Sequence, residues 1–263
     1  MAGASDIKAY LMDNLKTHFM GRDLHYLAVT ASTQDIAREL AEEGAHEGTA
    51  VIAGEQRSGR GRMGRSWLSP VGGLATSIIL RPPLASIYLL PAITSVAVFR
   101  TLRNLGIRAG IKWPNDVLIE DKKVCGILIE HGLKASELSY SIVGIGINVN
   151  FDTGSYPEIA DIATSLSVQL GHEVPVAEVT RHLYAELEDI YTRIGEPSYI
   201  IKEWSQHMVT IGRSVSADFH GNRIDGTAEG VNRQGNLVIR LADGSAREIV
   251  AGDVTVANRN GGA

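Results

Sequence analysis

The spacing of apolar residues predicts alternating strands and helices over the first 105 residues. Within residues 25–45, a strand is followed by a helix with four residues on one face, Ile36, Ala37, Leu40 and Ala41. Ser32 stands three residues before Asp35 at the start of this helix, a pattern typical of a helix N-cap. The same reasoning predicts strands at 49–56 and 74–80 and helices at about 5–18 and 87–105.

Shorter apolar runs separated by turns fill the rest of the chain. Four β-rich runs between 107 and 150 are split by short turns and predict an antiparallel meander. Residues 151–207 combine loop with helix, most clearly at 176–194. From about 209, short strands alternate with Gly, Asn and Asp turns, which is typical of a small barrel. We therefore predict two domains, 1–208 and 209–263.

The composition is that of an ordinary globular protein. The chain has 263 residues, 44% of them hydrophobic, and its net charge of -5 argues against a main role in nucleic-acid binding. Cys125 is the single cysteine, which excludes an intrachain disulfide and a four-cysteine metal site. No apolar run has the length of a signal peptide or approaches the ~20 residues of a membrane span. We expect a cytoplasmic protein without a membrane partner.

Residues 54–67, GEQRSGRGRMGRSW, imitate two nucleotide-binding motifs. Their glycines satisfy the dinucleotide fingerprint G-x-G-x-x-G and, with arginine in place of lysine, nearly satisfy the phosphate loop G-x-x-x-x-G-K-[ST]. Both motifs require a helix directly after the glycines, whereas Trp67, Pro70 and a Gly pair follow here. Neither motif therefore applies, and a merely solvated connection stays open as an alternative.

The chemistry of this segment instead predicts an anion-binding loop that is not built on a helix end. Glycines allow the backbone close to a ligand, and Arg60, Arg62 and Arg65 can form paired hydrogen bonds with carboxylate or phosphate oxygens. Repulsion among the arginines should hold the loop open without an anion. We therefore expect residues 57–66, the Gly/Arg loop, to become ordered when a ligand binds.

A second group of candidate residues lies in the β-rich region, within KWPND at 112–116 and just beyond it. Pro114 starts a turn that places Asn115 and Asp116 at the end of a strand. Lys123 follows the next tight corner, so its ammonium group is expected to project from a rigid hairpin. Taken singly, each feature also fits ordinary turn chemistry or a solvated lysine.

Five motifs, in this order, resemble those of biotin protein ligases: STQ at 32–34, EQxxGRGRxGRxW at 55–67, KWPND at 112–116, KxxGIL at 123–128 and GIGINVN at 144–150. The resemblance extends over roughly residues 27–257. It implies an α+β fold, a mixed sheet with flanking helices related to lipoate ligases, followed by a small all-β SH3-like barrel. It also implies an enzyme that joins biotin to ATP as biotinoyl-5'-AMP and passes the biotinoyl group to a carrier lysine.

The resemblance assigns roles residue by residue. The biotin-binding positions correspond to Ser32, Thr33, Gln34, Gln56, Gly59, Arg60, Gly61, Arg62, Lys123 and Gly126. The positions that bind ATP and the adenylate correspond to Arg62, Arg65, Trp67, Asn115, Asp116, Lys123 and Asn148. The catalytic positions correspond to Lys123, Arg62, Asp116 and Lys112. Two roles have structural alternatives, a helix cap for Ser32 and a plain core side chain for Trp67.

The implied substrates and cofactors are ATP, biotin and Mg²⁺, and the sequence does not identify the metal ligands. The implied partner is the biotin carboxyl carrier protein or domain of a biotin-dependent carboxylase, and a homodimer is a further expectation. About 30 residues precede Ser32, too few for the N-terminal DNA-binding domain of some relatives, so we expect the monofunctional type without nucleic-acid binding. Two alternatives stay open: a lipoate or other acyl ligase on the same core, and a non-catalytic protein that binds biotinoyl-AMP.

Overall fold

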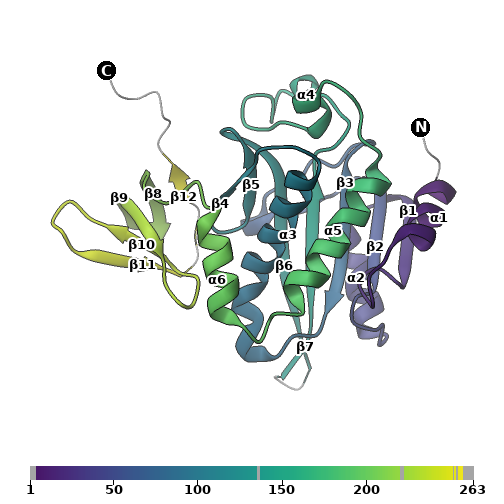
Figure 1. Ribbon diagram of the computed structural model, residues 1–263, viewed down its shortest axis with the longest axis horizontal. Coiled ribbons are helices and arrows are strands. Elements are labelled where there is room, and N and C mark those ends of the chain that lie inside the picture. Colours follow the sequence, from purple (N-terminus) through teal and green to yellow (C-terminus); the bar gives the residue numbers. More distant parts are fainter. Residues whose placement is uncertain (1–3, 135–136, 220–221, 251, 253, 257–263) are drawn as a thin grey trace.

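The computed structural model describes residues 4–134, 137–219, 222–250, 252 and 254–256 (Figure 1). Within them, a mixed seven-stranded sheet carries helices on both faces, and a five-stranded antiparallel sheet follows it. The predicted combination of an α+β core with an all-β C-terminal part is therefore confirmed. The designation SH3-like for the smaller sheet stays a prediction.

Seven strands form the large sheet, in the spatial order β1-β2-β3-β7-β6-β5-β4. Their bounds are Leu24–Thr30 (β1), Ala50–Gln56 (β2), Leu74–Leu80 (β3), Gly110–Lys112 (β4), Asp116–Ile119 (β5), Lys122–Lys134 (β6) and Glu137–Ile147 (β7). β1 and β2 are parallel, because helix α2 (Thr33–Glu42) carries the chain back between them. The other neighbouring pairs are antiparallel, and β4 to β7 form the predicted meander.

Different helices cover the two faces of the large sheet. One face carries most of the apolar core and is covered by α1 (Ala4–Asn14), α3 (Leu90–Asn104) and α5 (Val176–Tyr191). Figure 1 shows α3 and α5 side by side in front of this sheet. α2 packs on the opposite face, where Ala37 and Ala41 share a smaller apolar cluster with β2, β3 and β7. Because successive strand residues point to opposite faces, this second face is free to hold polar side chains beyond α2.

The first helix is shorter than predicted. α1 stops at Asn14 instead of about 18. The backbone N–H groups of His18, Phe19 and Met20 donate to the Glu188 carboxylate of α5, at 2.7 to 2.9 Å. These long-range hydrogen bonds replace those that a further helical turn would have made.

The region predicted only as loop and helix contains more than one regular element. Besides α5, which ends at Tyr191 instead of about 194, it holds η3 (Thr153–Ser155), α4 (Leu166–Leu170) and α6 (Pro197–Gln206). Pro197 occupies the first turn of α6, where its missing N–H group costs no hydrogen bond. α6 then packs against α3 and leads into the C-terminal sheet.

One helical stretch corrects the expectation about membrane spans. η2 (Leu84–Leu89) joins α3, and together Leu84–Asn104 are long and apolar enough, by length and composition, to cross a membrane. Among the described residues this is the one such stretch, and most of its apolar window is buried. Its apolar character is explained by packing, because α3 contacts α5, α6 and the large sheet on its different sides.

The C-terminal sheet has the order β11-β10-β9-β8-β12 and lies beside α6 (Figure 1). Its strands are Ser214–Phe219 (β8), Asn222–Val231 (β9), Leu237–Arg240 (β10), Ala246–Ile249 (β11) and Val254–Val256 (β12). The Trp113 indole donates to the Gly235 carbonyl at 3.0 Å, and the Trp113 backbone N–H donates to Thr210 Oγ1 at 3.0 Å. The two sheets therefore share one continuous buried core, and the domain boundary near 208 stays a prediction.

Candidate active site

A cavity of about 240 Å³ lies on the partly covered face of the large sheet. Its walls come from the start of α2, the Gly/Arg loop, β3, β6, β7, the KWPND turn and β12. The predicted site residues that line it are Ser32, Thr33, Gln34, Gln56, Arg60, Gly61, Arg62, Arg65, Trp67, Lys112, Asn115, Asp116, Lys123 and Gly126. The fold thus brings together side chains that are almost one hundred positions apart in the sequence.

Two predicted site residues, Gly59 and Asn148, lie outside this lining. Gly59 is buried at the base of the Gly/Arg loop, where its carbonyl accepts a hydrogen bond from the Trp67 backbone N–H at 2.8 Å. Asn148 is buried just after β7, and its side-chain amide donates to the Thr164 carbonyl at 3.0 Å. Both residues support the walls of the cavity here, and their direct contact with ligand stays a prediction.

Three glycines form a flat floor under the cavity. A Cβ at Gly126 would lie 2.8 Å from the Trp67 ring, and one at Gly146 would overlap that ring more severely. A Cβ at Gly144 would lie 2.9 Å from the Gln34 carboxamide. Glycine is therefore required on these two strands so that Trp67 and Gln34 can lie directly against the sheet.

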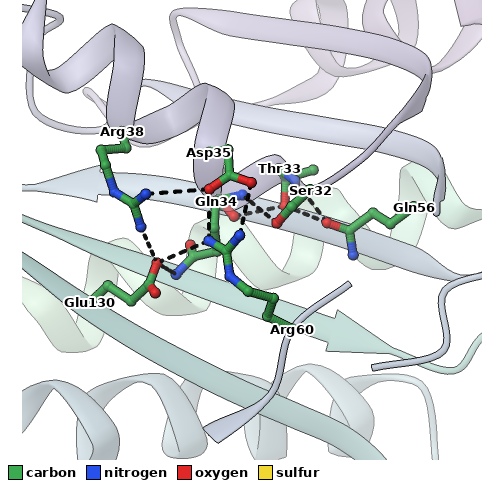
Figure 2. Close-up of polar contacts among 9 residues, drawn as sticks. Ser32, Thr33, Gln34, Asp35, Arg38, Gln56, Arg60 and Glu130 are labelled. Atoms are coloured by element: carbon green, nitrogen blue, oxygen red, sulfur yellow. Dashed lines mark hydrogen bonds and ion pairs between the residues drawn. The ribbon is translucent and has the colours of Figure 1, made fainter. Parts of the chain in front are cut away.

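The start of α2 forms a neutral, hydrogen-bonding wall (Figure 2). Ser32 is the N-cap of α2, and its hydroxyl accepts a hydrogen bond from the Gln34 backbone N–H at 3.3 Å. Gln56 Oε1 accepts from both the backbone N–H and the hydroxyl of Thr33, at 2.8 and 3.0 Å. The Thr33 hydroxyl also lies 2.7 Å from Ser77 Oγ. Because Gln56 Oε1 is bonded to Thr33, the Gln56 Nε2 group is oriented to donate to a neutral polar ligand.

Gln34 is oriented by a carboxylate from β6. Its Nε2 donates to Glu130 Oε2 at 3.1 Å (Figure 2). Its Oε1 is buried and has no hydrogen-bond partner among the described residues. Because a buried acceptor without a partner is costly, this oxygen is suited to accept an N–H group from a ligand in the cavity.

Arg60 and Arg62 have different partners, although both belong to the same loop. Arg60 donates to both carboxylate oxygens of Asp35 at 2.8 Å, and these hydrogen bonds hold the pKa of Asp35 below its usual range. Arg62 donates to the neutral Asn115 Oδ1 at 2.7 Å. The expected repulsion that holds the loop open therefore does not apply to Arg60, because a carboxylate already balances its charge.

The β5–β6 hairpin positions Lys123 from both sides. The Lys123 ammonium group lies 2.7 Å from Asp116 Oδ1 and 5.4 Å from the centre of the Trp67 ring. Its backbone N–H donates to the Ile162 carbonyl at 2.8 Å, and its carbonyl accepts from the Thr164 N–H at 3.0 Å. The lysine therefore projects from a fixed backbone, as predicted, and Trp67 lines the cavity instead of lying in the core.

Cationic groups dominate the charged part of the lining. Its positive side chains are Arg60, Arg62, Arg65, Lys112 and Lys123. Among the described lining residues, the carboxylate of Asp116 is the one negative group. Although the chain carries a net charge of -5 and Asp35 balances Arg60, cations still outnumber the single lining carboxylate, so this cavity is a local positive region that attracts anions.

Several residues of the site were missed by the sequence analysis. Asp35 was assigned only to the helix start and Glu130 received no role, yet both contact Arg60. Gly144 and Gly146 were quoted within a motif without a role, although glycines at i and i+2 of a strand share one face and thus signal a flat surface. No local pattern identified Val254 and Thr255 of β12, which also line the cavity.

Comparison with known proteins gives matches over both sheets. Residues 26–148 match the Biotin/lipoate A/B protein ligase family, and residues 210–256 match the Biotin protein ligase C terminal domain. The bifunctional ligase/repressor BirA of Bacillus subtilis is 39% identical over 249 residues, which cover 91% of this chain and 76% of that protein. The biotin--[acetyl-CoA-carboxylase] ligase of Paracoccus denitrificans is 31% identical over 224 residues, with coverage of 81% and 92%.

A solved structure shows the same arrangement of elements. The biotin protein ligase from Aquifex aeolicus in complex with biotin and ATP superposes with a TM-score of 0.78 and is 31% identical, covering 90% of this chain and 99% of that one. The similarity thus extends over most of the chain. Given these matches along the chain and the site geometry described above, the protein belongs to the biotin protein ligase family.

Proposed function

We propose that the protein activates biotin with ATP and transfers the biotinoyl group to a lysine of a biotin carboxyl carrier domain. In the first step, a carboxylate oxygen of biotin attacks the α-phosphorus of ATP and pyrophosphate leaves. In the second step, the deprotonated amine of the carrier lysine attacks the acyl carbon and AMP leaves. The observation that carries this proposal is the lining of one cavity by a neutral hydrogen-bonding wall and a cluster of cations.

The neutral wall suits the ureido head of biotin, which offers both N–H donors and a carbonyl acceptor. The Gln56 Nε2 group supplies a donor, and Gln34 Oε1, which has no partner among the residues that the structure describes, supplies an acceptor. Thr33 fixes Gln56, so the wall is organised before a ligand arrives. Such preorganisation lowers the entropic cost of binding.

The cationic cluster addresses the main obstacle to adenylation, which is the repulsion between a carboxylate and a polyphosphate. Lys123, Arg62 and Lys112 line the same cavity and offset that negative charge where the two reactants meet. Trp67 covers the glycine floor beside Lys123 and helps to keep water from the reactive mixed anhydride. Lys123 is the principal catalytic residue in this proposal.

Mg²⁺ is the expected companion of ATP. Among the described residues, no three His, Cys, Asp or Glu side chains gather as a ready-made metal site. Asp116 lines the cavity and is paired with Lys123 through Oδ1, so it would offer at most its second carboxylate oxygen to an ion held mainly by phosphates and water. When bound, the ion would neutralise part of the triphosphate charge.

The proposal has a direct test. The protein is incubated with ATP, Mg²⁺ and labelled biotin or labelled lipoate, with and without a biotin carboxyl carrier domain. We expect label on a carrier lysine with biotin alone. Labelling by lipoate would support an acyl ligase of different specificity, and a tightly retained adenylate that never transfers would support a non-catalytic binding protein.

The carrier domain, a cytoplasmic location and a homodimer are further parts of the proposal. The carrier domain and the homodimer are expected from the family, and the location is expected from the single cysteine of the sequence. None of the three rests on a contact seen in the structure. Size-exclusion chromatography with light scattering, with and without biotin plus ATP, would test the dimer, for which the expected mass is twice the 28.3 kDa of the chain.

A further inference from the structure

We propose that Asp35 and Glu130 are positioning residues that latch the Gly/Arg loop through Arg60, and that this latch sets how long the biotinoyl-adenylate is retained. The inference rests on the proposed function. Neither carboxylate lines the cavity, so each acts on the ligand only through another residue. We refer to Asp35, Glu130 and Arg60 as the latch.

The latch has the geometry of a specific contact. The two terminal nitrogens of Arg60 each donate to a different oxygen of Asp35 at 2.8 Å, and one of them lies 3.5 Å from Glu130 Oε2 (Figure 2). A forked pair of this kind fixes the orientation of the guanidinium plane as well as its distance. Arg60 therefore ties the loop to the first turn of α2 and to β6 at once.

The positive charge of Arg60 is balanced by this contact. Its two carboxylate partners come from outside the loop, whereas Arg62 in the same loop donates to a neutral amide, Asn115. The two arginines thus have different roles. Arg60 holds the loop, and the positive charge of Arg62 is available to an anion. This division could not be inferred from a sequence in which the two residues look alike.

The latch also reaches the neutral wall of the cavity. Glu130 Oε2 accepts hydrogen bonds from Gln34 Nε2 at 3.1 Å and from Arg38 at 2.9 Å, in addition to its contact with Arg60. One carboxylate oxygen is therefore shared by a lining residue and by the loop. A ligand that fixes Gln34 also fixes Glu130, and so favours the latched position of the loop.

The test replaces Asp35 by Asn, which keeps the size of the side chain and removes its charge. Glu39→Gln is the matched control, because Glu39 is an exposed carboxylate one turn further along α2. Two quantities are measured on the full chain: amide hydrogen exchange of residues 57–66 without ligand, and the dissociation rate of biotinoyl-5'-AMP. In Asp35→Asn we expect both to rise about fivefold, the effect of losing its partly exposed ion pair with Arg60. The variant also weakens the 3.3 Å contact between Asp35 and Arg38, which lies within α2 and does not hold the loop. Asp35→Glu should restore most of the difference.

A second variant shows whether the effect passes through Arg60. In an Arg60→Gln background, Asp35→Asn should change neither quantity further, because the two residues act as one unit. Additive effects would overturn the latch. So would loop exchange in Asp35→Asn equal to that of the parent and of Glu39→Gln, or faster exchange with an unchanged dissociation rate.

The same measurements separate the latch from the proposed function. If the parent protein forms no biotinoyl-AMP, the proposed function fails, while the exchange of residues 57–66 still decides whether Asp35 holds the loop. If the parent is active and the exchange does not change in Asp35→Asn, the function stands and the latch is refuted. Thermal unfolding of each variant confirms that the fold is intact.

Discussion

Lys123 and Asp116 form an ion pair across the β5–β6 hairpin, with 2.7 Å between the lysine Nζ and the aspartate Oδ1. The pair holds the ammonium group at the cavity, next to the face of Trp67. A cation held in this way stabilises charge that develops during adenylation without having to reorganise first.

Removal of the lysine should therefore slow adenylation severely. In Lys123→Ala we expect biotinoyl-AMP formation to fall by at least about a hundredfold, because one preorganised electrostatic donor is lost. The measurement is single-turnover release of pyrophosphate. Lys122→Ala is the control, since Lys122 is an exposed lysine in the same hairpin. A normal rate in Lys123→Ala would refute the catalytic role.

The glycine floor predicts a second, purely steric effect. Gly146→Ala places a methyl group in steric overlap with the Trp67 ring. Because the ring must move, the change should lower the free energy of unfolding by about 1 to 3 kcal/mol. Urea unfolding measures this change, and Gly230→Ala is the control because a Cβ there meets open space.

The mechanism of this effect can be checked by a compensating change. Trp67→Leu removes the bulk that the new methyl group meets, so Gly146→Ala should cost less in that background than in the parent. Equal costs in both backgrounds would mean that Trp67 is not the obstacle. Activity is expected to fall in both variants, because the floor also supports Lys123.

The Gly/Arg loop should become resistant to protease when a ligand is bound. Trypsin has several arginine sites between Arg57 and Arg65, and biotin with ATP and Mg²⁺ should protect them by stabilising the folded loop. Mass spectrometry of the fragments locates the cleavage. Cleavage after Arg247, an exposed residue of β11, should be unaffected by the ligands. Equal cleavage of the loop in both states would contradict the expected ordering.

The Cys125 thiol should be unreactive in the folded protein. Its side chain is fully buried in β6, and burial raises the pKa of the thiol far above its usual range, so little thiolate forms at pH 8. A colorimetric thiol reagent should detect no free thiol in native conditions and one per chain in concentrated urea. Rapid labelling of the native protein would show that the core opens at this strand.

The sequence by itself predicted the local elements, and its resemblance to the ligase family supplied 14 of the residues that line the cavity. The meander of β4 to β7 followed from short apolar runs and turns, and the Gly/Arg loop was separated from nucleotide motifs because no helix follows it. These features depend on residues that are close in the chain, where period, turn chemistry and motif spacing are visible.

Only the tertiary structure decided which partners these residues meet. The parallel pairing of β1 with β2 brings Thr33 to Gln56, and the position of β6 in the sheet brings Glu130 to Gln34 and Arg60. Sheet order and register set such contacts, and neither leaves a local trace in the sequence. For that reason the sequence predicted one shared anion-binding role for Arg60, Arg62 and Arg65. In the structure, Arg60 instead binds carboxylates, whereas Arg62 donates to the neutral Asn115 in the cavity.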